Sequence, residues 1–154
     1  MTRYNVRLSV CVVAAGLLLA GCNRYERKEF ENFSPSIQAS RFKTIATVAA
    51  SDGRTDLRLM VQAREDLRKA GWNAVRASGR WDNVTDVIGQ VCAPGVSQPV
   101  DGVLVVTYNH LVLYDCQTTK AAYEIQSSPE NGGLSLDGMV GRLVNYLKGK
   151  PAPP

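Results

Sequence analysis

The sequence predicts a small α/β (α+β) domain, in which a mixed sheet of about four strands is covered by two to three helices. Short runs rich in β-branched residues alternate with segments whose apolar residues recur at helical spacing, in the order β-α-β-α-β-β-α. Glycine, proline and aspartate separate these segments. With 154 residues, 45% of them hydrophobic and 21% charged, the chain has the length and composition of one globular domain.

The first half of the domain has the pattern strand, helix, strand. Residues 43–50 are rich in β-branched residues and are followed by Asp52-Gly53, which is typical of a strand that ends in a turn. Apolar residues then recur at spacings of three and four, which predicts a helix that Gly71 stops. Residues 72–77 alternate between polar and apolar types and predict the second strand. The apolar face of the helix consists of Leu57, Met60, Ala63, Leu67 and Ala70.

A short helix and a strand hairpin follow. Residues 82–91 predict a helix with Asp82 as its cap. Residues 103–108 form a continuous apolar run, which is typical of a central strand buried on both faces. We expect residues 110–114 to continue or bend that strand, and residues 120–127 to return as another strand after a turn.

The last predicted element is a helix that begins after Ser135, a residue type that favours the N-cap position. Gly149 and Pro151 stop it. Its apolar residues form one stripe, which consists of Leu136, Met139, Val140, Leu143, Val144 and Leu147.

The amino terminus has the three parts of a secretory signal peptide. Arg3 and Arg7 precede an apolar run over residues 8–20, and small residues follow at the expected cleavage point. The run is shorter than the ~20 residues needed to span a bilayer. The sequence Leu19-Ala20-Gly21-Cys22 resembles the lipobox of bacterial lipoproteins. That resemblance implies that the Cys22 thiol takes a diacylglycerol and that cleavage leaves Cys22 as the first residue. The alternatives are a plain secretory signal or an uncleaved anchor.

These features predict the domain organisation and the compartment. We expect a signal peptide over residues 1–21, a lipidated, flexible tether over 22–40, one domain over 41–148 and a disordered tail over 149–154. The lipobox resemblance implies a bacterial cell-envelope protein that faces the periplasm. The residue after the cysteine is Asn23 rather than the aspartate that favours inner-membrane retention in enteric lipoproteins, so the outer membrane is favoured over the inner.

Residues 42–148 resemble the small α/β domains of other envelope lipoproteins, of the kind found at the amino termini of TolB-like and curli-secretion lipoproteins. The resemblance rests on the strand-helix-glycine-strand opening, on the segment from Asp101 to Tyr108 and on the closing helix after Gly133. It implies a fold and carries no activity.

Two cysteines remain once Cys11 is removed with the signal and Cys22 is lipidated. An oxidising compartment and one remaining pair predict a disulfide between Cys92 and Cys116. Their separation of 24 positions does not fit the Cys-x-x-Cys spacing of a redox pair. The alternative is two separate thiols.

No residue pattern identifies catalytic chemistry, a metal site or a cofactor. His110 is the only histidine and lacks the neighbours of a metal site, so we expect a structural or surface role. Trp81 is expected to pack on the sheet, with ligand binding as the minority interpretation. The mature chain carries 16 basic and 14 acidic residues, and its cations form no stripe interleaved with aromatics, so nucleic-acid binding is unsupported.

The sequence therefore favours a non-enzymatic, membrane-anchored domain that binds or supports another envelope component. A second hypothesis is an accessory lipoprotein that docks onto a secretion, peptidoglycan-synthesis or outer-membrane-assembly machine. A third is an enzyme of unrecognised type, which requires a carboxylate or thiol within reach of His110.

Replacing Cys22 tests the anchor. We expect Cys22→Ala to abolish lipidation and leave the uncleaved precursor in the inner membrane, because the thiol is the group that accepts the lipid. Metabolic labelling with a radioactive fatty acid measures this directly. Label retained on the variant would show that another residue is the acceptor.

Overall fold

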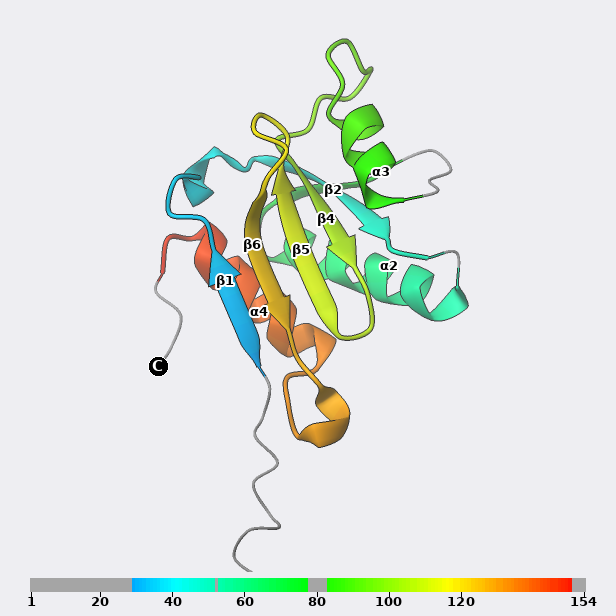
Figure 1. The fold of residues 1–154 in the computed structure, drawn as a ribbon, viewed down its shortest axis with the longest axis vertical. Helices are drawn as coiled ribbons and strands as arrows, with labels where there is room; N and C mark the ends of the chain where they lie inside the picture. Colours follow the sequence, from blue (N-terminus) through cyan, green and yellow to red (C-terminus); the bar gives the residue numbers. More distant parts are fainter. Residues whose placement is uncertain (1–28, 52, 78–82, 151–154) are drawn as a thin grey trace, which may run out of the picture.

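In the computed structural model, which describes residues 29–51, 53–77 and 83–150, helices cover both faces of a six-stranded mixed sheet (Figure 1). No helix of these residues is long and apolar enough to cross a membrane. The strands are β1 (Phe30–Phe33), β2 (Thr44–Ala49), β3 (Asn73–Arg76), β4 (Gly102–Val106), β5 (His110–Asp115) and β6 (Ala121–Gln126). The helices are α2 (Arg54–Lys69), α3 (Val84–Val91) and α4 (Leu136–Leu147), with the 3₁₀ turns η1 (Ala39–Arg41) and η2 (Pro129–Asn131).

The strand order is β1-β6-β5-β4-β2-β3. β2 lies between β3 and β4 and is parallel to both, whereas β4, β5, β6 and β1 form an antiparallel series. From β2 the chain passes through α2 to β3, which lies on one side of β2 in the sheet. It then passes through α3 to β4, which lies on the other side of β2. Crossovers between parallel strands are right-handed almost without exception, so this reversal places α2 and α3 on opposite faces.

The two faces carry cores of different size. On one face α2 and α4 pack against the sheet, and Ile45, Leu104, Leu113, Tyr123 and Leu143 are fully or almost fully buried there. On the other face α3 covers only part of the sheet, over a smaller cluster that includes Val87, Val103 and Val105. Every residue of β4 is buried, which confirms the prediction of a central strand covered on both faces.

The start of β4 is fixed by the pair Asp101-Gly102. The Asp101 carboxylate accepts the backbone N–H groups of Lys43 and Thr44, each at 2.8 Å, and so holds the start of β2 beside β4. A Cβ atom on Gly102 would lie 2.8 Å from the ring of Phe42. Only glycine therefore allows Phe42 to close this end of the core.

The sheet has more strands than predicted, for two reasons. The predicted strand bend after residue 108 is a complete hairpin, in which the N–H of Thr107 donates to the carbonyl of His110 at 2.9 Å and β5 turns back along β4. The second reason is β1, which pairs with β6 inside the segment predicted to be a flexible tether. The tether prediction is therefore wrong from Phe30 onwards, and the folded domain begins before residue 41.

Element ends differ from the predictions in two places. Asn83, not Asp82, caps α3, because the Asn83 side chain accepts the N–H of Asp86 at 2.9 Å; Asp82 lies outside the described residues. The disordered tail was predicted to begin at residue 149. Gly149 and Lys150 instead belong to the fold, because their backbone N–H groups donate hydrogen bonds to the last turn of α4. The predicted cap of α4 is confirmed: Ser135 accepts the N–H of Gly138.

The stripe of α4 allows a direct test of the larger core. Leu143 is fully buried, so Leu143→Asp would place an unpaired charge there and should lower the free energy of unfolding by about 4 kcal/mol or more. Thermal or urea unfolding measures the change. Val61→Asp is the control, because Val61 is 42% exposed on α2 and its replacement should change stability by about 0.5 kcal/mol or less. Equal effects of the two changes would contradict the assigned core.

Candidate functional site

A groove lies between the edge strand β1 and the carboxyl-terminal half of α4, which is seen behind β1 in Figure 1. Its cavity volume is about 540 Å³. We call it the β1–α4 groove, and it is lined by Glu31, Phe33, Ala39, Tyr123, Arg142, Tyr146, Gly149 and Lys150. Concave sites with aromatic walls and a few polar groups are typical of binding sites, so this groove is the best candidate among the described residues.

A polar network forms one end of the groove. The Arg142 guanidinium lies 3.1 Å from one carboxylate oxygen of Glu31, and the Tyr123 hydroxyl donates to the other at 2.7 Å. Burial, and then the hydrogen bond to Glu31, raise the pKa of Tyr123 well above its usual range. The Tyr123 hydroxyl is therefore the donor in this hydrogen bond.

Aromatic rings form the rest of the groove wall. The ring of Tyr146 stacks on that of Tyr123 with centroids 4.9 Å apart, and the ring of Phe33 lies 6.3 Å from Tyr146. The Tyr146 hydroxyl donates to the carbonyl of Ile37 at 3.3 Å, which fixes the ring against the segment after β1. Phe33 is 57% exposed, so one face of this aromatic wall is open to solvent.

The chemistry of the groove suits binding better than catalysis. The Glu31 carboxylate is engaged by both Arg142 and Tyr123, so it is not free to act as a general base. Lys150 lies exposed at the rim and forms no ion pair with any residue that the structure describes. The groove therefore presents aromatic surface with net positive charge at its rim.

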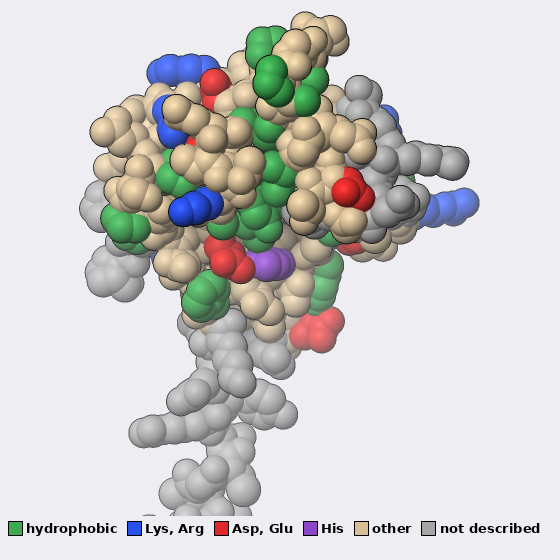
Figure 2. All heavy atoms as spheres, turned by 45° about the horizontal axis from the view of Figure 1, so that its top comes forward, with side chains coloured by type: hydrophobic (Ala, Val, Ile, Leu, Met, Phe, Trp, Pro, Cys, Tyr) green, Lys and Arg blue, Asp and Glu red, His purple; other side chains and the backbone are tan. Residues whose placement is uncertain are grey.

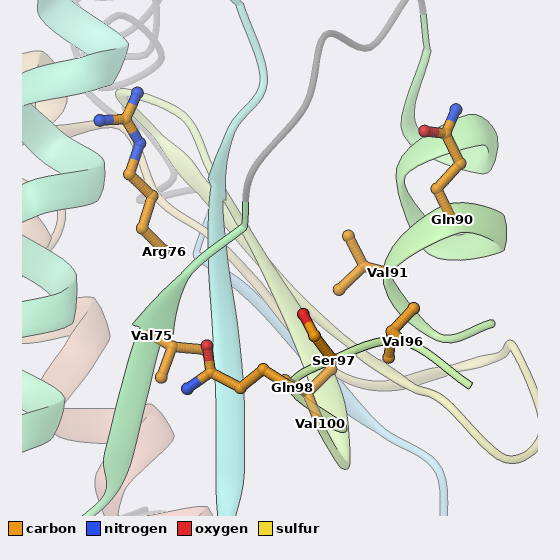
Figure 3. A pocket seen from close by; sticks show the side chains of 8 residues that line it. All are labelled: Val75, Arg76, Gln90, Val91, Val96, Ser97, Gln98 and Val100. Carbon is orange, nitrogen blue, oxygen red and sulfur yellow. The ribbon is translucent and has the colours of Figure 1, made fainter. Parts of the chain in front are cut away.

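A smaller cavity of about 270 Å³ lies on the opposite face, between β3, α3 and the loop that precedes β4. Four valines from these segments line it, together with Ser97, Gln98, Gln90 and Arg76 (Figure 3). In Figure 3 the polar ends of Gln90 and Arg76 lie away from the valines. Its polar side chains form no hydrogen bonds with one another, and it contains none of the predicted site residues, so the β1–α4 groove remains the better candidate.

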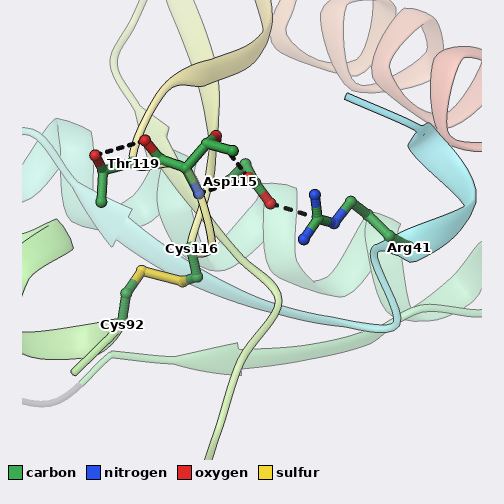
Figure 4. The surroundings of a disulfide bond; sticks show 6 residues. Arg41, Cys92, Asp115, Cys116 and Thr119 are labelled. Carbon is green, nitrogen blue, oxygen red and sulfur yellow. Dashed lines mark hydrogen bonds and ion pairs between the residues drawn. A yellow bond between two sulfur atoms is a disulfide. The ribbon is translucent and has the colours of Figure 1, made fainter. Parts of the chain in front are cut away.

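The predicted disulfide is present. Cys92, which caps the end of α3, is bonded to Cys116 in the β5–β6 turn, with an S–S distance of 2.01 Å and a Cα–Cα distance of 5.1 Å (Figure 4). The disulfide connects α3, on the partly covered face of the sheet, to the hairpin of β5 and β6. Both cysteines are thereby structural in this state rather than reactive.

Asp115, next to the disulfide, is fully buried. One carboxylate oxygen accepts the backbone N–H and the hydroxyl of Thr118, at 2.8 and 2.6 Å, and the other lies 3.4 Å from the Arg41 side chain (Figure 4). These contacts hold the β5–β6 turn, in which Thr119 adopts a φ of 57°. They also attach η1 to the end of the sheet.

His110 lies at the start of β5 on the face that α3 only partly covers. Figure 2 shows this histidine beside an acidic side chain, below a strip of hydrophobic groups. Its Nε2 atom lies 2.8 Å from a carboxylate oxygen of Glu124, and both side chains are about one-third exposed. The sequence did not identify Glu124 as the partner of His110, because the two residues lie on different strands, 14 positions apart. His110 lines neither of the cavities described above.

The other predicted site residues lie outside the described residues: Cys22 and Trp81 both belong to the parts that the structure leaves undescribed. Among residues 29–51, 53–77 and 83–150, no cluster of three metal-ligating side chains is present. Sequence reasoning missed the β1–α4 groove altogether, because its ion pair joins residues 111 positions apart.

Comparisons with known proteins identify similar solved structures but no family. No protein-family model matches the chain, and no curated protein matches it. Among solved structures, a variant PelC dodecamer from Paraburkholderia phytofirmans is 12% identical, with a TM-score of 0.48 over 79% of this chain and 97% of that one. A second PelC dodecamer structure from the same organism is 11% identical, with a TM-score of 0.44 over 81% and 99%. Neither TM-score reaches 0.5, so we draw no conclusion about this chain from them.

The disulfide should contribute a large part of the stability. Cys92→Ser should lower the free energy of unfolding by roughly 2–4 kcal/mol, because closing a loop of this length restricts the unfolded chain. Denaturant unfolding of protein matured in the periplasm measures the loss. The double variant Cys92→Ser/Cys116→Ser is the control, since it removes the same bond and should lose about the same amount. Alkylation of both thiols in native, unreduced protein would contradict the pairing.

Proposed function

We propose that this chain is a lipid-anchored protein of the bacterial cell envelope. It is attached through Cys22, faces the periplasm and lies in the outer membrane rather than the inner. Its domain binds another envelope component and catalyses no reaction. The observation that supports this proposal is the position of β1, which begins eight residues after the lipobox cysteine. The proposed resemblance to TolB-like and curli-secretion lipoprotein domains is consistent with this role.

The short distance between Cys22 and β1 orients the domain. Eight residues reach at most about 28 Å when fully extended. Phe30, the first residue of β1, pairs with Gln126, and Gln126 also pairs with His110 at the start of β5. The end of the sheet that carries the β4–β5 turn therefore faces the bilayer, and the disulfide-bonded end faces the periplasm.

The same orientation suits a more specific role, in which the protein docks onto a secretion, peptidoglycan-synthesis or outer-membrane-assembly machine. In that case the β1–α4 groove lies at the side of the domain, where a partner on the same membrane can reach it. A different candidate, an enzyme of unrecognised type, is favoured by one observation, the carboxylate of Glu124 beside His110. Glu124 also lines a cavity of about 330 Å³ together with Phe33 and Tyr123, but His110 does not line it.

The orientation can be measured with fluorescent labels in vesicles. Tyr108 is 42% exposed in the β4–β5 turn, and Lys120 is exposed in the β5–β6 turn at the other end. Single labels on Tyr108→Cys and Lys120→Cys of the lipidated protein are exposed to a short-range quencher carried by lipid headgroups. We expect stronger quenching at position 108.

Two outcomes would overturn this proposal. Equal quenching at the two positions, or stronger quenching at position 120, contradicts the orientation. Quenching that persists in labelled protein that begins at residue 23, and so carries neither the apolar run of residues 8–20 nor a lipid, shows that the lipid is not what holds the domain at the membrane.

A further inference from the structure

We propose that the β1–α4 groove binds an extended peptide segment of a partner protein. The segment adds a strand to the open edge of β1, places a large apolar side chain against the rings of Phe33 and Tyr146, and directs a carboxylate towards Lys150. This inference deepens the proposed binding role and rests on it, but the site does not depend on lipidation.

The open edge of β1 follows from its register with β6. The N–H of Ser34 donates to the carbonyl of Ala122 at 3.0 Å, and the register pairs Asn32 with Glu124. Hydrogen-bonded pairs alternate along an antiparallel ladder. The N–H and C=O groups of Glu31 and Phe33 therefore point away from β6, and no described residue forms a hydrogen bond with them.

The other edge of the sheet, β3, is covered at Ala74. On β3 the outward carbonyl of Ala74 accepts the Arg68 side chain at 2.7 Å, and the outward N–H of Ala74 donates to the carbonyl of Trp72 at 3.0 Å. Side chains and turns that cover an edge in this way prevent pairing with other chains. β1, where the outward groups of both Glu31 and Phe33 are open, is thus the more accessible edge for another strand.

The register of an added strand directs its side chains into the groove. Residues directly opposite each other in paired strands place their side chains on the same face. Glu31 and Phe33 face α4, as their contacts with Arg142 and Tyr146 show. α4 passes Glu31 at Arg142 and Phe33 at Tyr146, so Lys150 lies past the Phe33 end of β1. The ligand residue that pairs with Phe33 therefore faces the rings, and the ligand residue two positions further along faces Lys150. This is the geometry of strand addition, in which main-chain bonds provide affinity and pockets for alternate side chains provide specificity.

The charge of the groove indicates which side chains fit. Arg142 is already paired with Glu31, so the charge at the rim that remains without a partner among the described residues is that of Lys150. A ligand carboxylate complements this cation, and an aromatic or large aliphatic side chain complements the rings. A partner segment that alternates an apolar with an acidic residue satisfies both.

The test is selection of displayed random nonapeptides on the purified full chain in detergent. We expect enrichment of sequences with a large apolar residue two positions from an acidic one. Synthetic copies of the enriched peptides should bind Phe33→Ala about tenfold more weakly, as expected for an anchoring aromatic residue. Copies that are N-methylated at alternate residues should lose binding, because they cannot donate main-chain hydrogen bonds to β1.

Phe30 provides a matched control. It lies on the same strand and is 49% exposed, against 57% for Phe33, but it faces away from α4. Phe30→Ala should change affinity by less than about twofold. Lys150→Glu should shift the enriched sequences from acidic to basic residues. Unchanged thermal midpoints show that each variant is folded.

Three outcomes would overturn the inference. Enrichment no greater on the wild type than on Phe33→Ala means that the groove binds no peptide. Binding that tolerates N-methylation excludes strand addition. Concentration-dependent dimerisation that Phe33→Ala abolishes would assign the edge to a second copy of the chain. None of these results bears on the anchor, which fatty-acid labelling of Cys22 tests separately.

Discussion

The buried side chain of Asp115 joins three parts of the domain at one end of the sheet. It terminates β5, holds the turn to β6 through Thr118 and attracts Arg41 of η1. The next residue, Cys116, connects α3 through the disulfide and donates its backbone N–H to the carbonyl of Asp101, which in turn secures β2. A rearrangement of this end would leave the buried Asp115 side chain with fewer partners, which is costly, so this end of the molecule has little freedom to move.

The shape of the β1–α4 groove depends on that end of the sheet. Arg41 fixes η1, and the segment just before η1 supplies the carbonyl of Ile37 that holds the Tyr146 hydroxyl. Tyr146 then positions the rings of Tyr123 and Phe33. Pre-organised rings lose little conformational freedom when a ligand arrives, which favours affinity. The rigid disulfide end and the open edge strand are therefore parts of one arrangement.

The sequence predicted the features that leave a periodic or local signal in the order of the residues. The stripes of α2 and α4, the buried run of β4 and the pairing of Cys92 with Cys116 all carry such signals. β1 carries none, because Phe30 and Phe33 stand three apart among charged residues and the strand exists only through β6 and α4. The separation of β4 from β5 was missed for a related reason. The turn Tyr108-Asn109 lacks the glycine that marks a two-residue hairpin. The groove joins β1 to α4, so no local signal could have found it.

The antiparallel pairing of β1 with β6 also sets the mechanical behaviour of the domain. For a chain held at its amino-terminal side and pulled from the disulfide-bonded end, the force acts along the axis of β1. The hydrogen bonds between the two strands are then loaded together, in shear, rather than broken one after another. The loop between Cys92 and Cys116 cannot lengthen under such a load, because the covalent bond closes it. Tension between the amino-terminal side and the disulfide-bonded end would thus be borne by the whole length of β1 at once.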